Sequence, residues 1–159
     1  MKKNAFTLVE VIIAVGIISF VSVGVLYGVS LSLTSAALIK NDLIAANLAQ
    51  EGLEVVRGIR DRDWHSGSAF GASLPNGNYL VDRDSQSLIG FSDTFLKIDS
   101  NGLYNYSSGP DTIFKRKLII EDSVQNPAAI EKVAKVEVFW NEKSGLKTIQ
   151  AELRLFNWR

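Results

Sequence analysis

A long apolar stretch, residues 6–39, follows a short polar tail at the start of the chain. From Val11 to Ile39 it carries no charged residue, and Glu10, near its start, is the one carboxylate inside it. About 20 apolar residues are enough to cross a bilayer as a helix. A charge within a membrane segment is costly and usually has a partner or a function. The pattern therefore predicts a membrane helix in which Glu10 has a role of its own.

The hydrophobic pattern changes at Lys40 from continuous to periodic. Around and after this point the apolar residues recur mainly at spacings of three and four, which predicts one face of an amphipathic helix. The set is Leu38, Ala45, Leu48, Gly52, Val55, Val56 and Ile59. One helix is thus predicted over residues 6–61. Its first part needs lipid or neighbouring helices around it, and its second part needs a sheet to cover one face.

Three glycines, Gly16, Gly24 and Gly28, interrupt the apolar stretch, and the last two form a GxxxG pattern. Small residues four positions apart permit close approach of membrane helices, but such helices also tolerate glycine in general. The sequence leaves both interpretations open. Glycine costs about 1 kcal/mol relative to alanine in a helix, so these positions are also candidate weak points.

The residues after the helix read as a loop at 63–78 followed by strands. Turn chemistry and alternating apolar positions predict a weak strand at 78–83, a hairpin of 94–98 and 103–106 around a turn at 99–102, a strand at 114–121, and strands at 135–140 and 148–155 joined at 141–145. The residues predicted to face inward are Phe114, Leu118, Ile120, Val136, Val138, Trp140, Ile149, Ala151, Leu153 and Leu155. A long N-terminal helix followed by an antiparallel sheet predicts an α+β fold.

Composition narrows the function. The chain has 159 residues, with 17 basic and 17 acidic side chains, so it has no electrostatic footprint for nucleic acid. Cysteine is absent, which excludes disulfides, thiolate zinc sites and a cysteine nucleophile. Lys2 and Lys3 precede the apolar stretch, and the positive-inside rule places that end in the cytoplasm and the C-terminal part outside.

The region after the helix offers little catalytic chemistry. His65 is the single histidine, and a zinc site there would have to use Asp61 and Asp63, so a solvated loop histidine is expected. Residues 99–102 faintly resemble a calcium loop, but the glycine comes too early and a plain turn is expected. Trp64, Trp140 and Trp158 are expected in packing roles rather than on a sugar-binding surface. The prediction is therefore no catalytic residue, no cofactor and no metal site.

The N-terminal sequence from Lys2 to Val11 resembles the class III signal of type IV pilins and of the pseudopilins of type II secretion systems. The resemblance implies cleavage between Ala5 and Phe6 by a prepilin peptidase, methylation of the new Phe6 amine, and a role in assembly for Glu10. The residue before the cut is usually glycine in that family and is alanine here. The implied parts are a leader at 1–5, a helix at 6–61 with a transmembrane and assembly segment at 6–39, and a globular β-rich head at 62–159.

Two later segments, residues 49–57 and 136–140, are similar to minor pilins and minor pseudopilins of the PilV and GspI type. The family resemblance implies a structural subunit held first in the cytoplasmic membrane, with its head outside, and then in a pilus or pseudopilus fibre. The implied partners are other pilin or pseudopilin subunits, the prepilin peptidase, the inner-membrane assembly platform and lipid.

Other interpretations of the N-terminus remain. Ser35-Ala36-Ala37 imitates the cleavage site of a secretory signal peptide, but the apolar stretch is about twice the usual length for one. An ordinary signal anchor fits the length and leaves Glu10 unexplained. The main functional alternative is a single-pass anchored protein whose outer β domain binds a ligand and never polymerises. The sequence does not distinguish adhesion, secretion and DNA uptake.

Overall fold

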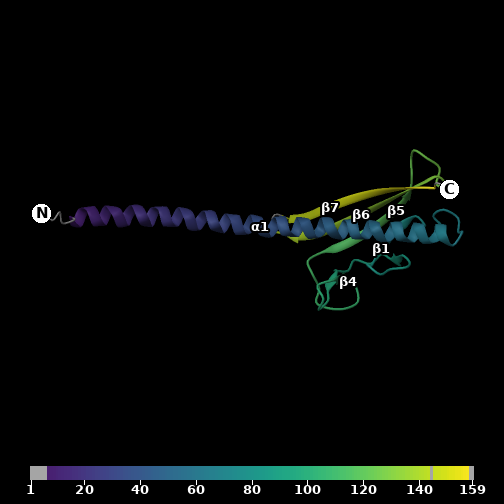
Figure 1. The fold of residues 1–159 in the computed structure, drawn as a ribbon, viewed down its shortest axis with the longest axis horizontal. Coiled ribbons are helices and arrows are strands. Elements are labelled where there is room, and N and C mark those ends of the chain that lie inside the picture. Colours follow the sequence, from purple (N-terminus) through teal and green to yellow (C-terminus); the bar gives the residue numbers. More distant parts are fainter. Residues whose placement is uncertain (1–6, 144, 158–159) are drawn as a thin grey trace. The chain divides into compact units, whose positions relative to one another are not determined.

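The computed structural model describes residues 7–143 and 145–157. Its elements are one long helix, α1 (Leu8–His65), followed by strands that form two antiparallel sheets (Figure 1). The predicted α+β class is confirmed. Contacts divide the chain between Asn41 and Asp42 into two compact units, which are described separately below.

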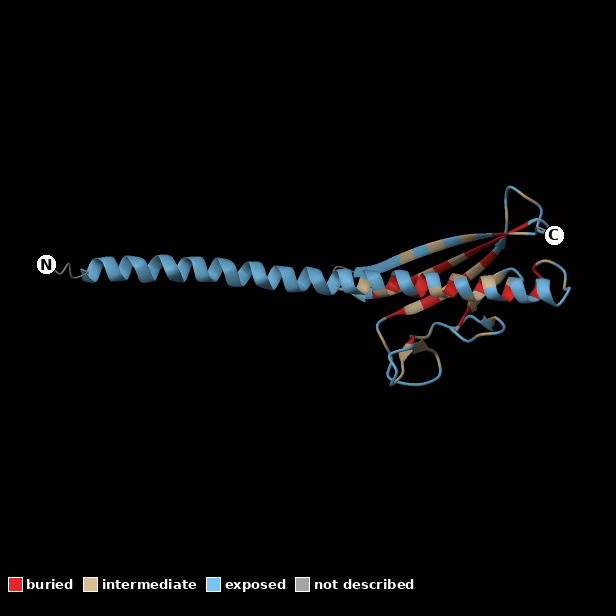
Figure 2. Ribbon diagram, viewed as in Figure 1, coloured by how far each residue is buried: buried red, intermediate tan, exposed pale blue. Residues whose placement is uncertain are grey.

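In the first unit α1 is helical from Leu8 onward, and its apolar side chains are exposed along its length, as the pale blue half of Figure 2 shows. Phe6, the predicted first residue of the helix, lies outside the described residues. The helix is continuous through Gly16, Gly24 and Gly28.

The end of α1 lies beyond the predicted Asp61. The helix continues to His65 because Gly67 closes it with a left-handed turn, at φ 74°. The Ser68 N–H donates to the Asp63 carbonyl (3.0 Å) and the Gly67 N–H donates to the Trp64 carbonyl (3.2 Å), the paired bonds of a glycine-terminated helix. The predicted loop beginning at residue 63 was therefore wrong by one turn.

In the second unit the amphipathic part of α1 packs on the larger sheet. Its buried residues follow the predicted spacing and are Ala45, Leu48, Ala49, Gly52, Val56, Ile59 and Asp63. Val55 is half-buried, whereas Leu38 is 42% exposed, so the buried face begins at Ala45 and the prediction that it includes Leu38 was wrong.

The larger sheet has the strand order β2-β1-β5-β6-β7. Its three long strands are β5 (Lys115–Asp122), β6 (Glu131–Glu142) and β7 (Gly145–Phe156), each antiparallel to the next. In this register Val136 lies opposite both Leu118 and Ala151. The predicted strands are confirmed, and β6 and β7 extend beyond the predicted bounds at both ends.

The short strands differ more from expectation. β1 (Gly77–Leu80) begins one residue early and stops three residues before the predicted Arg83, and β2 (Ile89–Gly90) was not predicted. β3 (Lys97–Ile98) and β4 (Tyr104–Asn105) form the predicted hairpin, although each is only two residues long. They make a separate two-stranded sheet.

The core of the second unit lies between α1 and the inner face of the larger sheet, and its buried residues are the red bands on α1 and on the strands in Figure 2. The predicted inward residues of β5 and β6 are buried, and those of β7 are half-buried except for the buried Leu155. Trp140 is 2% exposed, and its ring lies 5.7 Å from that of Phe114. The alternation of the three strands therefore predicted the core correctly.

Candidate functional site

The apolar part of α1 has the properties of a membrane anchor. Among the described residues α1 is the one helix long and apolar enough to cross a membrane, and its most apolar 18-residue stretch has mean hydropathy 2.5 with none of it buried. Leaving such a surface in water would be strongly unfavourable. Lipid or other apolar helices are the environments that suit it.

Three of the hydroxyl groups inside this part of α1 are hydrogen-bonded within the helix. Ser19, Ser22 and Thr34 each donate to the backbone carbonyl four residues earlier, at 2.8, 2.8 and 3.0 Å. A polar group without a partner in hydrocarbon costs several kcal/mol. For these three hydroxyls the bonds remove that cost, which makes them compatible with burial in lipid.

Thr7 caps the first turn of α1, a feature that the sequence analysis missed. Its hydroxyl oxygen accepts the Glu10 N–H at 3.3 Å, and its carbonyl accepts the Val11 N–H at 3.3 Å. Thr7 and Glu10 have the spacing of a capping box, a local signature that was present in the sequence. Glu10 thus occupies the first turn, where a carboxylate interacts favourably with the helix dipole.

The carboxylate of Glu10 remains available for a further partner. Within residues 7–143 and 145–157 this carboxylate has no hydrogen bond and no ion pair, and Glu10 is exposed. Ala5 and Phe6, the predicted processing residues, lie outside the described residues. The structure therefore does not place Phe6 relative to Glu10, and cleavage between Ala5 and Phe6 stays a prediction.

The three glycines of the apolar segment have open surroundings. A Cβ atom built on Gly16, Gly24 or Gly28 would meet no heavy atom within 4 Å. Nothing in the chain itself therefore uses the close approach that glycine permits. A role in helix packing or in loosening of the helix stays a prediction about an assembled state.

The residues considered for a zinc site are engaged elsewhere. Asp63 is buried, and its two carboxylate oxygens accept the Ser73 N–H at 2.9 Å and the Ser73 hydroxyl at 2.6 Å. Asp61 pairs with Arg60 at 2.6 Å. No group of three or more metal-ligating side chains occurs in the described part of the chain. Asp63 instead ties the loop after α1 to the end of the helix.

The possible calcium loop is a hydrogen-bonded turn. Asp99 Oδ1 accepts the backbone N–H groups of Asn101 (2.8 Å) and Leu103 (2.9 Å). The Leu103 N–H is the main reason that the pKa of Asp99 is lower than usual. This carboxylate holds the β3–β4 connection in shape.

The two tryptophans among the described residues, Trp64 and Trp140, have different surroundings. Trp140 is buried in the core, and its Nε1–H donates to Glu142 at 2.9 Å. Trp64 is 46% exposed near the end of α1, and Trp158 lies outside the described residues. Trp140 confirms the expected packing role.

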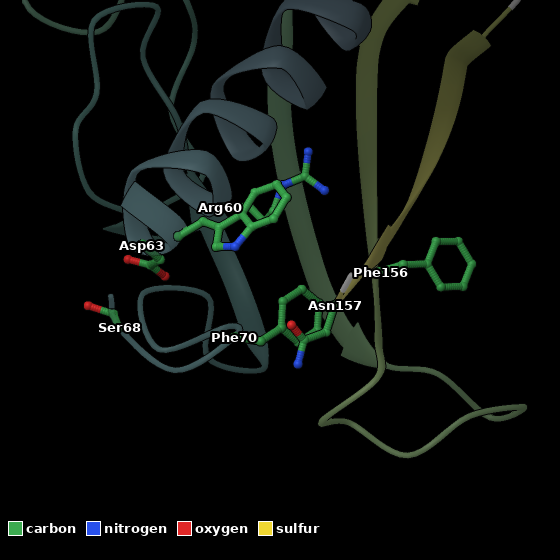
Figure 3. A pocket seen from close by; sticks show the side chains of 7 residues that line it. Arg60, Asp63, Ser68, Phe70, Phe156 and Asn157 are labelled. Carbon is green, nitrogen blue, oxygen red and sulfur yellow. The ribbon is translucent and has the colours of Figure 1, made fainter. Parts of the chain in front are cut away.

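A small pocket lies beside the end of α1, between the helix and the C-terminal end of β7 (Figure 3). Trp64, Phe70 and Asn157 contribute to its lining. The cavity volume is about 20 Å³, which is room for a water molecule or two rather than for an organic ligand.

Comparison with known proteins supports the assignment of the N-terminus. Residues 1–26 match the family model described as the prokaryotic N-terminal methylation motif. No curated protein and no solved structure matches the chain. The similarity of residues 49–57 and 136–140 to the PilV and GspI type therefore stays a hypothesis.

The motif and the anchor agree with each other. The matched residues include Glu10 and the first half of the exposed apolar helix. Proteins with this motif are structural, and the motif implies processing by a prepilin peptidase and assembly into pilin-type fibres. The chain therefore carries the prepilin-type signal of type IV pilins and pseudopilins on a membrane-anchoring N-terminal helix.

Proposed function

We propose that this chain is a structural subunit of a membrane-assembled fibre, a minor pilin or pseudopilin of a type IV pilus, a type II secretion system or a competence fibre. The observation that carries the proposal is the methylation motif at residues 1–26 on a continuous helix whose apolar part is exposed. Lipid covers this surface before assembly, and the helices of other subunits cover it in the fibre.

The polar chemistry of the first turn supports an assembly role. Cleavage before Phe6 creates a positive amine on the residue four positions before Glu10 in the sequence. Glu10 has no partner among the described residues, so its carboxylate is free to pair with the amine of a neighbouring subunit. Attraction between these charges is strengthened by the low dielectric constant of lipid. The pair would select the docked position rather than add general stability.

The proposed route begins in the cytoplasmic membrane. Lys2 and Lys3 hold the leader on the cytoplasmic side, and the second unit lies outside the cytoplasm. The prepilin peptidase removes residues 1–5, and the inner-membrane assembly platform then transfers the subunit into the fibre. The second unit serves in packing and contact rather than in catalysis, because its candidate residues Asp63 and Asp99 are used in local turns.

Photo-crosslinking through the apolar helix tests this proposal. A photoreactive residue replaces the exposed Val25, and a matched control carries it at Gln150 on the exposed face of β7. A fibre subunit gives adducts with other pilin-like subunits from position 25 when the assembly system is active, and loses them when it is absent. An anchored binding module that never polymerises gives no such adducts in either strain, which would contradict the proposal.

A further inference from the structure

Arg116 is a buried arginine in the middle of the inner face of the sheet. It lies on the same face of β5 as Leu118 and in step with Phe114 just before the strand, and only 1% of its surface is exposed. A buried charge is costly unless it is paired and hydrogen-bonded. Its contacts therefore show what the side chain holds in place.

The guanidinium group of Arg116 joins separate segments of the second unit. Its Nη1 donates to the Leu48 carbonyl at 3.1 Å and to Glu51 Oε1 at 2.9 Å, both on α1. Its Nη2 donates to the carbonyl of Val81, directly after β1. The Tyr106 hydroxyl donates to the backbone carbonyl of Arg116 at 3.4 Å. One residue thus connects α1 with β5 and with the segments after β1 and β4.

The helix surface around this contact includes several small residues. Ala45, Ala49 and Gly52 are buried against the sheet, and a Cβ atom on Gly52 would lie 3.1 Å from Val136. Apolar burial is not directional. The helix repeats small or apolar residues on successive turns, so hydrophobicity alone distinguishes weakly between positions one turn apart, and the close fit of Gly52 to Val136 is the other feature that can distinguish them.

Glu51 distinguishes these positions. Four residues before it stands Asn47 and four residues after it stands Val55, and neither has a carboxylate. Glu54, three residues after it, is exposed and pairs with Arg57. A slip of α1 by four residues in either direction would leave Arg116 buried without its ion pair, which is strongly unfavourable. The geometry points to Arg116 and Glu51 as the positioning pair that sets the register of α1 on the sheet. Single buried polar groups fix register in the same way in coiled coils.

For the proposed fibre subunit this register has a functional consequence. A slip of one turn, about 5.4 Å, would change the length of helix between Glu10 and its first contact with the sheet. The pair would therefore set how many residues separate Glu10 from the first turn of α1 that packs on the sheet. This consequence rests on the proposed function, whereas the register itself does not.

Distance measurement between two spin labels tests the register. The chain lacks cysteine, so Gln50→Cys on α1 and Thr148→Cys on β7 give two defined sites at exposed residues. The full chain is measured in detergent micelles with Arg116, with Arg116→Met and with Glu51→Ala. The matched control is Glu54→Ala, which removes an exposed carboxylate that pairs with Arg57 at 2.6 Å.

We expect one narrow distance distribution for the parent and for the control. Arg116→Met and Glu51→Ala should add a second distance or broaden the distribution, with displacements on the scale of one helical turn. Arg116→Met is expected to stay folded, because it removes the buried charge itself and the Glu51 side chain that remains is 31% exposed. A changed distance at an unchanged unfolding midpoint would separate positioning from general support of the fold.

If either folded variant gives the same distance distribution as the parent, the inference is overturned. The register would then be set by the close fit of Gly52 against the sheet. If Arg116→Met does not fold, Glu51→Ala alone decides. No fibre takes part in the measurement, so its failure is distinguishable from failure of the proposed function.

Discussion

At the scale of single residues, Glu10 has two possible roles, one in the helix end and one in assembly, and a comparison of two variants separates them. The first turn of α1 uses its backbone N–H as the partner of Thr7, while the proposed assembly uses its carboxylate. We predict that Glu10→Ala inserts and folds normally but enters the fibre about tenfold less, the effect of about 1.4 kcal/mol in docking. Membrane level and filament level of the processed chain are compared by immunoblot.

The matched control for Glu10 is Thr7→Ala, which removes the cap and keeps the carboxylate. Loss of the cap costs about 1 kcal/mol of local helix stability, and we expect fibre entry close to the parent level. An equal loss of fibre entry in both variants would show that the effect comes from the disturbed helix end and not from the missing carboxylate. Normal entry of Glu10→Ala would contradict a role for the carboxylate in assembly.

Two helix glycines of the second unit form a matched pair. Gly58 has open space where a Cβ would stand, and Gly52 has Val136 at 3.1 Å. We predict that Gly58→Ala raises the free energy of unfolding by about 0.5–1 kcal/mol. Gly52→Val should lower it by about 1–3 kcal/mol through overpacking. Urea unfolding followed by tryptophan fluorescence measures both, and a destabilised Gly58→Ala would contradict this account of the helix.

Glu131 makes stability depend on pH. It is buried, and Asn126 donates to its carboxylate at 2.6 Å while Arg154 donates at 3.1 Å. The Asn126 bond is the main cause of its lowered pKa, with Ser123 and Arg154 adding to it. The stabilisation is present above the ordinary value of about 4.5 and is lost as the pH falls through the lower folded pKa.

We therefore predict that Glu131→Gln unfolds more easily than the parent at pH 7 and loses less stability between pH 7 and pH 3. Urea midpoints at the two pH values give the comparison. If the midpoint falls between pH 7 and pH 3 by the same amount in Glu131→Gln as in the parent, the stability gained from this carboxylate does not depend on its ionisation.

Short sequence motifs allow some local features to be predicted at single residues, whereas contact partners far apart in the sequence could not be predicted. The Thr7–Glu10 capping pair and the terminating Gly67 are short motifs that the sequence contains. The alternation of β5 also places Arg116 on the inner face, but a charged residue is normally expected outside. Its partners Glu51 and Val81 lie 65 and 35 residues away, and no periodicity in the sequence relates them.

At the scale of elements, long periodic segments were predicted well and short or charged ones were not. The core faces of β5, β6 and β7 follow from alternation. The start of β6 was missed because Glu131 and Lys132 are buried there and break the alternating pattern. β2 has two residues and is defined by pairing with β1, which no local signal reveals.

The division of α1 gives a prediction about fragments. A chain that begins at Ser35 lacks most of the apolar segment and keeps every buried residue of α1, so we expect a folded, soluble monomer. A chain that begins at Asp61 loses Leu48, Val56 and Ile59 from the core. These three alone contribute roughly 5–9 kcal/mol of burial, comparable with the whole stability of a domain.

Size-exclusion chromatography and circular dichroism of the two fragments provide the test. The longer fragment should elute as a monomer with helix and strand signals, and the shorter one should aggregate. Aggregation of the longer fragment together with a folded shorter one would mean that the second unit does not depend on α1.

At the scale of the whole molecule, the two units are suited to different environments. The first is suited to lipid or to other helices, and the second has a buried core and polar outer strand faces. The zero net charge and the absence of cysteine do not bear on this division. The methylation motif joins the two observations, because it marks proteins that pass from membrane to fibre through their N-terminal helix.

Peptide mass spectrometry of isolated fibres tests the central claim most directly. Sheared filaments, or crosslinked fibre complexes from the membrane for a secretion system, are digested and searched for the N-terminus of this chain. The account predicts a peptide that begins at Phe6 with a methyl group on its amine and contains intact Glu10. A chain found only in the membrane fraction, beginning at Met1 or after Ala37 in a strain with active peptidase, would contradict it.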